Sequence, residues 1–184
     1  MCRAVTVLRQ GLLSGRAVAV GGGVPAAVVD GLAGLAARVE EMDIGFDEDR
    51  ARAWATEASP LHGLVFDAGS AFGGGGQASL GTTLERAWVA TRGVATGALI
   101  PGGAGKVLLI APRAGAGSFG VAARAALENL ARTLSVEWAR CGVSTVAVAP
   151  GARISDAELA ELVCFLISPA GDYFSGCVFE LDRD

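Results

Sequence analysis

Short apolar runs alternate with longer segments of mixed apolar and polar residues along most of the chain. The runs have the length of β-strands, and Gly, Pro or charged residues bound most of them. From Val143 to Val148, apolar residues alternate with polar or small ones, as expected for a strand. Strands are predicted near residues 16–20, 38–42, 63–67, 106–110, 143–148 and 177–181.

The segments between these runs predict helices. Asp47 can cap the N-terminus of one helix, because its carboxylate can accept a hydrogen bond from the first turn. Glu48 and Asp49 suit the positive end of that helix, and Glu48 is spaced to pair with Arg52 one turn later. Longer helices are predicted near residues 80–98 and 118–140, and a last helix begins at Ser155.

This alternation predicts a doubly wound α/β fold with about six mostly parallel strands and helices on both faces. The chain has 184 residues, of which 52% are hydrophobic, which suits one domain spanning residues 1–184. The net charge is −4 at pH 7 and the arginines are dispersed, which argues against nucleic-acid and anionic-membrane partners. No segment reads as a secretory signal or a membrane span, so we expect a cytoplasmic protein.

Two segments in the second half of the chain carry specific motifs. One contains ALENLARTLSVEWARCGV followed by AVAPG, and the other reads ELVCFLISPAGDYFSGCVFELD. Their order and spacing resemble the catalytic helix, the strand after it, and the last helix and strand of the short-chain dehydrogenase/reductase family. GLVFDAG and GKVLLIAPRAG are similar to two earlier strands of that family. The resemblance implies a Rossmann-like sheet and a relationship to NAD(P)-dependent oxidoreductases.

The resemblance also indicates where the family's catalytic residues would fall. In the family, a tyrosine hydroxyl exchanges a proton with the substrate, and a lysine one helical turn later lowers its pKa. The tyrosine position falls at Gly120 and the lysine position at Arg124. The family's serine falls at Pro112 and its helical asparagine near Ala90, so no catalytic residue is predicted. Tyr173 is the only tyrosine, and it lies just before the last strand.

The first crossover resembles a dinucleotide-binding turn with altered spacing. GGGVPAA can make the tight turn, but Ala26 or Ala27 replaces the glycine that lets the backbone approach phosphates. Pro25 removes one N–H donor that a phosphate would use. The acidic pair at residues 40–41 lies where a ribose-binding carboxylate would fall, which favours NAD over NADP. We expect no cofactor or weakly bound NAD, and the candidate contact residues are Gly21, Gly22, Gly23, Glu40, Asp67, Gly69, Pro150 and Gly151.

The chain is shorter than a full member of that family. Between the first strand and GLVFD there is room for one strand, whereas the family has two strands with a helix between them. After Pro150 and Gly151 the family inserts a mobile segment that covers the substrate, but here Ser155 already begins the last helix. A substrate bound at this edge would therefore lie open to water.

Other kinds of site find little support in the sequence. His62 is the only histidine, and it precedes a strand at the amino edge of the sheet, whereas ligands bind at the carboxyl edge. The four cysteines form no C-x-x-C pair, so no metal site is predicted, and Cys141, Cys164 and Cys177 are expected to be core thiols. The glycine run at residues 73–76 lacks the Lys and Ser/Thr placement of a phosphate cradle and predicts a flexible loop.

The helices near residues 80–98 and 118–140 correspond to those that form a four-helix dimer bundle in the family. Both keep their length, and the second carries small residues that permit close helix approach, namely Ala122, Ala125, Ala126 and Ala131. The favoured interpretation is a non-catalytic partner or regulatory subunit of an active, related dehydrogenase, in a homo- or hetero-oligomer. The alternatives are an NAD(P)-dependent oxidoreductase with atypical catalytic residues and a small-molecule binding module that uses the vacated cleft.

Overall fold

The computed structural model describes residues 8–73 and 75–182 of the chain. Six strands form one sheet in the order β2-β1-β3-β4-β5-β6, and every neighbouring pair of these strands is parallel. The strands are β1 (Ala17–Gly21), β2 (Arg38–Glu41), β3 (Gly63–Asp67), β4 (Gly105–Ile110), β5 (Val143–Pro150) and β6 (Val178–Leu181). The six predicted strands are therefore confirmed, and the described sheet is wholly rather than mostly parallel.

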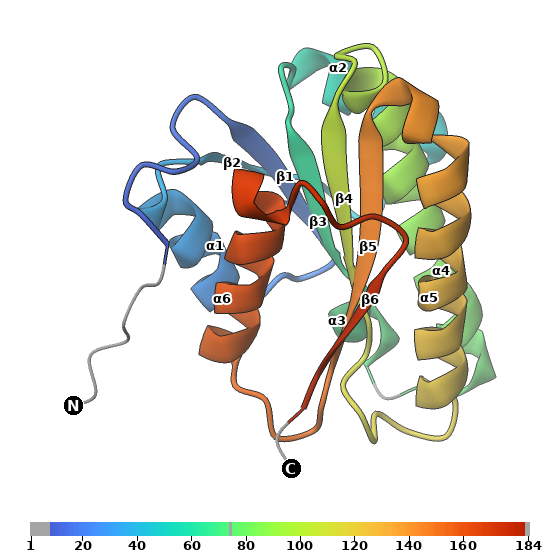
Figure 1. The fold of residues 1–184 in the computed structure, drawn as a ribbon. Coiled ribbons are helices and arrows are strands. Elements are labelled where there is room, and N and C mark those ends of the chain that lie inside the picture. The colour runs from blue at the N-terminus through green and yellow to red at the C-terminus, as the bar shows by residue number, and fades with distance from the viewer. Residues whose placement is uncertain (1–7, 74, 183–184) are drawn as a thin grey trace.

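Helices cover both faces of the sheet (Figure 1). They are α1 (Ala26–Gly34), α2 (Glu48–Glu57), α3 (Ala68–Phe72), α4 (Gln77–Val94), α5 (Gly120–Glu137) and α6 (Asp156–Ile167). Helices α1 and α6 pack on one face, and α2, α4 and α5 pack on the other. A π-helical turn (Ala95–Leu99) continues α4, and short 3₁₀ turns follow α5 (Ala139–Cys141) and α6 (Pro169–Gly171). The predicted doubly wound, Rossmann-like fold is confirmed.

The side chains of β1 show how the strands divide the core into two layers. Ala17 and Ala19 belong to the layer under α2, α4 and α5, while Val18 and Val20 belong to the layer under α1 and α6. This two-residue period follows from strand geometry. All four side chains are buried, because a parallel sheet of this kind has helices on both faces.

Glycines let α2 approach α4 closely. A Cβ atom placed on Gly93 would lie 2.5 Å from the Cβ atom of Ala51. A Cβ atom on Gly97, in the π-helical turn, would lie 2.5 Å from the backbone oxygen of Arg52. Both positions therefore require glycine for the two helices to pack at this distance.

The N-terminus of α2 follows the prediction in its cap but not in its ion pair. Asp47 accepts a hydrogen bond from the Arg50 backbone N–H at 2.9 Å, as predicted. The predicted pair between Glu48 and Arg52 is wrong. Glu48 instead pairs with Arg92 of α4 at 2.7 Å, and Arg52 faces Asp49 at 3.3 Å. The close packing of α4 brings the Arg92 guanidinium to Glu48, which local spacing along α2 could not indicate.

Lys106, the only lysine of the chain, is buried near the amino end of β4. Its Nζ donates to the backbone oxygens of Leu166, at 3.0 Å, and Ser168, and pairs with Asp172 Oδ1 at 2.7 Å. Burial lowers the pKa of Lys106, and the hydrogen bond from its ammonium to the Asp172 carboxylate opposes that shift. The ammonium thus satisfies carbonyl groups that the end of α6 leaves without helical partners.

The cysteines are less buried than predicted. Cys164 of α6 is buried, which confirms that part of the prediction. Cys141, in the 3₁₀ turn after α5, is partly exposed, and Cys177, in the turn before β6, is exposed. The core-thiol prediction is therefore wrong for these two residues, because both lie in connections at the surface rather than within a helix or strand that faces the core.

Candidate functional site

The chain changes direction across the sheet between β1 and β3. From β1 it crosses to β2 on one side and then returns to place β3 on the other side of β1. In open α/β sheets, ligands bind in the crevice outside the carboxyl ends of the strands at such a switch point. The glycine turn after β1 and helix α3 after β3 meet at this place, so they define the first part of the candidate site.

The glycine turn packs directly against the start of α3. Gly22 has a φ of +82°, and a Cβ atom there would lie 2.2 Å from the backbone oxygen of Asp67. Gly23 has a φ of +80°, and its Cβ atom would lie 2.4 Å from Ser70 Oγ. A residue other than glycine would thus be strained in conformation and would also clash. Four predicted contact residues, Gly22, Gly23, Asp67 and Gly69, are brought together here.

Asp67 is a buried carboxyl group at this edge of the sheet. Its Oδ1 accepts hydrogen bonds from the backbone N–H groups of Gly69 at 2.7 Å and Ser70 at 3.4 Å, and so caps α3. Burial raises the pKa of Asp67 to about 6, and these hydrogen bonds and the charge of Arg113 oppose the rise only in part. A neutral carboxylic acid and a carboxylate are therefore both accessible close to neutral pH.

A cavity of about 320 Å³ lies beside the glycine turn. Gly21, Gly22 and Gly23 line one side of it, and the segment that ends β2 lines the other with Glu41 and Asp43. These two carboxylates would repel an anionic group such as a phosphate. The helix that begins next to this cavity has Pro25 at its N-cap, with no side-chain cap.

The acidic residue beside the cavity is not the predicted one. Glu40 pairs with Arg38 on β2, while Glu41 is the residue that lines the cavity. Successive side chains of a strand point to opposite sides, so only one of the two neighbouring glutamates can reach the cavity. The sequence pointed to both neighbouring glutamates, and it could not indicate that Glu41 is the one that lines the cavity beside the glycine turn.

Arg124 ties together the carboxyl ends of β4 and β5. From the first turns of α5, its Nη1 donates to the backbone oxygens of Pro112 and Pro150, both at 2.8 Å. Its Nη2 donates to the backbone oxygen of Ala149 at 3.3 Å. The guanidinium therefore lies against the predicted contact residue Pro150, and its donors are directed at backbone oxygens of the protein itself.

Arg113 makes a second bridge over the same edge. It donates from Nη1 to the backbone oxygen of Ile154, and its Nη2 pairs with Asp156 Oδ1 at 2.5 Å. The loop after β4 is thereby fastened to the loop between β5 and α6. The predicted contact residue Gly151 lies in that second loop, where its N–H donates to the backbone oxygen of Leu181 at 2.7 Å. Sequence reasoning missed Arg113, although it directly follows Pro112, the residue aligned with a catalytic position.

Gly120 and Ala90, which the resemblance places at catalytic positions, and Tyr173, the only tyrosine, lie in different parts of the fold. Gly120 is the first residue of α5, and a Cβ atom there would have only the Cβ atom of Ala116 nearby, at 3.7 Å. Ala90 is buried in the core under α4. Tyr173 is 96% exposed. It adjoins Asp172, the partner of Lys106 near the amino end of β4, and so lies at the opposite edge of the sheet.

His62 lies at the amino edge, as predicted. Its Nδ1 accepts a hydrogen bond from the Ala17 N–H at 3.0 Å, and burial followed by the charge of Arg16 lowers its pKa. Within residues 8–73 and 75–182, no cluster of His, Cys, Asp and Glu is arranged to hold a metal ion. In the same part of the chain, none of the helices combines the length and apolar character needed to cross a membrane.

Several solved structures with the same fold are named as dehydrogenases. A dehydrogenase of citronellol catabolism from Pseudomonas aeruginosa is 23% identical, with a TM-score of 0.78 over 96% of this chain and 97% of that one. A protein from Beutenbergia cavernae, assigned as an NAD(P)-dependent gluconate 5-dehydrogenase and solved with NADP at low occupancy, is 21% identical, with a TM-score of 0.75 over 95% and 98%. A variant short-chain dehydrogenase/reductase from Serratia marcescens is 22% identical, with a TM-score of 0.74 over 92% and 97%. The sequence matches no protein-family model and no curated protein.

Proposed function

We propose that this chain, which has the fold of short-chain dehydrogenases/reductases, is a non-catalytic partner or regulatory subunit of an active dehydrogenase. The observation that carries the proposal is how two arginines are used at the carboxyl ends of β4 and β5. There Arg124 and Arg113 donate to backbone oxygens and to Asp156, so the two cations fasten loops together. A catalytic site at this edge would need donors directed at a substrate.

The residues at the family's catalytic positions support the same proposal. Gly120 has no side chain to give a proton, and Pro112 has no hydroxyl to hold a substrate oxygen. Arg124 stands at the position of the lysine, but its guanidinium remains protonated and is committed to backbone carbonyls. Loss of positioned acid–base catalysis alone lowers a rate by roughly 10²- to 10⁴-fold. We therefore assign no catalytic residue.

The surface formed by α4 and α5 is the one we assign to the partner. These helices lie side by side on one face of the sheet (Figure 1). Val121 and Val136 of α5 are 80% and 78% exposed, and Trp88 of α4 is 39% exposed. Ala125, between the two valines, is also exposed and adds no bulk that would keep a partner helix away. Large apolar side chains exposed along α4 and α5 suit a contact that excludes water, which supports the assignment of this surface to a partner.

The test is co-expression with an intact short-chain dehydrogenase/reductase from the same source, followed by affinity purification and light scattering. We expect a mixed complex whose formation raises the stability or the turnover of the active chain. Ala125→Arg should prevent the complex, because it places a charge in the apolar contact. Ala33→Arg, at an exposed position of α1 on the other sheet face, is the matched control and should leave the complex intact. If light scattering shows that this chain stays monomeric in the presence of every such dehydrogenase, the proposal is contradicted.

The second candidate is an NAD(P)-dependent oxidoreductase with atypical catalytic residues. The cavity beside the glycine turn favours it, because Glu41 is placed to accept hydrogen bonds from ribose hydroxyls. Calorimetry with NAD and NADP separates the two candidates. We expect no binding or weak binding of NAD, since Glu41 and Asp43 oppose phosphate groups. Tight binding of NADP together with steady turnover of an alcohol or ketone would favour the oxidoreductase.

A further inference from the structure

His62 holds the first residue of β1 at the amino edge of the sheet, opposite the edge where the glycine turn and the arginine bridges lie. It directly precedes β3, and its backbone N–H donates to the Ala17 oxygen at 2.8 Å. Its Nδ1 accepts a hydrogen bond from the Ala17 N–H at 3.0 Å. Both polar backbone atoms of Ala17 are therefore bound to His62, and the imidazole serves as an acceptor where parallel strands otherwise use backbone oxygens.

The hydrogen bond from Ala17 to Nδ1 requires a neutral imidazole. A neutral imidazole carries a proton on one nitrogen and accepts at the other, so Nδ1 accepts only in the tautomer with the proton on Nε2. A protonated imidazole has an N–H at both nitrogens, and Nδ1 would then present a donor to the donor of Ala17. Ala17 is 3% exposed, so water gives its N–H little compensation. Protonation of His62 therefore breaks the bond and leaves a buried donor without its acceptor.

Two arginines oppose protonation of the imidazole. Arg16 is exposed just before β1, and Arg38 lies on β2, where its guanidinium pairs with Glu40. Burial, followed by the charge of Arg16, lowers the pKa of His62, and the charge of Arg38 acts in the same direction. The Glu40 carboxylate is engaged by Arg38, so the imidazole meets positive charge from this side.

The strand on the other side of β3 brings a third cation. Lys106 of β4 donates its backbone N–H to the His62 oxygen at 3.2 Å. Its ammonium pairs with Asp172 at 2.7 Å, so the carboxylate on this side has a cation as well. These charged groups either repel a proton on the imidazole or are already paired, and they favour a neutral ring at pH 7.

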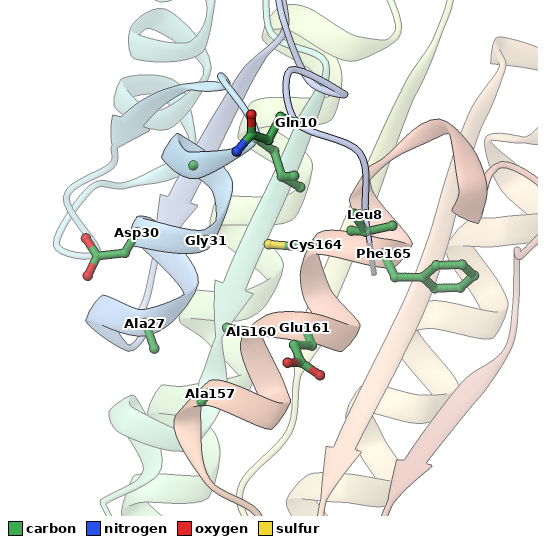
Figure 2. Close-up of a pocket in the computed structure, with 12 residues that line it drawn as sticks. Leu8, Gln10, Ala27, Asp30, Gly31, Ala157, Ala160, Glu161, Cys164 and Phe165 are labelled. Atoms are coloured by element: carbon green, nitrogen blue, oxygen red, sulfur yellow. The ribbon is translucent and has the colours of Figure 1, made fainter. Parts of the chain in front are cut away.

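The segment before Ala17 is held mainly on the side of α1 and α6. Leu13 is fully buried in the layer under these two helices. Figure 2 shows Leu8 and Gln10 beside the same helices, where they line the hollow between them. His62 ties the end of this segment to β3, on the other side of β1.

We propose that His62 is an acid-sensitive latch, whose protonation detaches the start of β1 from the start of β3 while the remaining strand pairs stay intact. The latch is independent of the partner function proposed for α4 and α5. Because the folded pKa of His62 lies below its ordinary value of 6.5, the stabilisation from the latch is fully present above pH 6.5. It is lost as the pH falls from there to the folded pKa. Asp67, at the opposite edge, titrates in a similar range with the opposite effect on stability, so the latch needs a measurement that resolves single residues.

The test is an NMR titration of the full-length chain from pH 7.5 to pH 5. His62 is the only histidine, so one set of imidazole signals reports on it. We expect the Nε2–H tautomer at pH 7.5, a midpoint below 6.5, and a shift of the Ala17 amide at the same midpoint. The hydrogen-exchange protection factor of Ala17 should fall about tenfold, as expected for the loss of one hydrogen bond, while that of Ala19 stays constant. A proton on Nδ1 at neutral pH, or an Ala17 amide that does not follow the imidazole, would overturn the proposal.

Two variants connect the response to the imidazole. His62→Asn supplies an amide oxygen that accepts a hydrogen bond and cannot titrate, so the Ala17 amide should stay protected at every pH. His62→Leu has no acceptor, so the protection of Ala17 should be low at every pH. Both variants retain Asp67, so its titration cancels when they are compared with the wild-type chain. If Ala17 keeps its wild-type pH dependence in His62→Asn, another group is responsible and the proposal fails. That variant alone decides the outcome if His62→Leu does not fold.

Discussion

Replacing Asp67 with asparagine should stabilise the protein at neutral pH. The carboxylate is 7% exposed, and burial raises its pKa from 3.8 to about 6. In the unfolded chain the same group would titrate near its ordinary value. Asparagine keeps the oxygen that accepts hydrogen bonds from Gly69 and Ser70, and it is an equally good N-cap residue. The substitution therefore removes the buried charge and retains the cap.

The magnitude follows from linkage between protonation and folding. Because the folded pKa of Asp67 lies above the unfolded one, the folded state binds more protons, and stability falls as the pH rises from about 4 to about 6. Each pH unit of difference is worth about 1.4 kcal/mol, so the loss is about 3 kcal/mol once the pH is above 6. Below pH 4 the group is protonated in both states and the loss vanishes. In the asparagine variant, residue 67 cannot titrate, so this loss of stability should be absent at every pH.

The assay is urea unfolding of both proteins at intervals between pH 4 and pH 8. The informative quantity is the difference in the free energy of unfolding between them, because titration of all other carboxylates cancels in it. We expect the free energy of unfolding of the variant to exceed that of the wild-type chain by an amount that grows with pH and reaches about 3 kcal/mol at pH 7. A difference that is constant with pH, or that changes in the opposite direction, would refute the reasoning that burial dominates at Asp67.

Three further predictions concern other parts of the fold. Lys106→Met should lower the free energy of unfolding, measured in urea, by about 2 kcal/mol, because buried carbonyl groups at the end of α6 lose their hydrogen-bond donor. An unchanged urea midpoint of unfolding would contradict this. Gly22→Ala should lower the free energy of unfolding by more than Gly115→Ala does. Both glycines have a positive φ, but only at Gly22 do backbone atoms of Asp67 occupy the place where a Cβ atom would stand. Equal effects of the two substitutions would show that this contact is unimportant. The double variant Gly120→Tyr and Arg124→Lys should show no NADH-dependent ketone reduction above background, because the serine position and the covering segment are still missing; turnover would contradict the assignment.

The sequence predicts the fold well because the signals for it are local. Six strands and the helices α2, α4, α5 and α6 follow from apolar runs and capping residues, and Asp47 caps α2 as expected. The short helix α3 was not predicted. The errors arise where a contact depends on packing between distant segments. Glu48 finds Arg92, which is 44 residues away in the chain, and nothing near Glu48 indicates this.

The candidate site is predictable only in outline. The glycine turn and Asp67 meet, as the topology of a doubly wound sheet requires. The arginine bridges were not predicted, because the reach of Arg113 and Arg124 depends on how the loops after β4 and β5 lie. The hollow of about 580 Å³ between α1 and α6 was not predicted either. Small residues at helical spacing are as compatible with a filled contact as with an open one, and only the relative position of two helices distinguishes them.

The position of Lys106 makes the chain unusual as a substrate for amine-directed chemistry. With a single lysine in the sequence, and with that lysine buried against the end of α6, the native surface that we describe presents no lysine amine. The Lys106 side chain is 11% exposed, and we expect an acylating reagent to react with Nζ mainly when the end of α6 separates from β4. The rate of lysine acylation, read by mass spectrometry, should therefore follow the opening of that one contact, and it provides an intrinsic reporter of local unfolding without an engineered label.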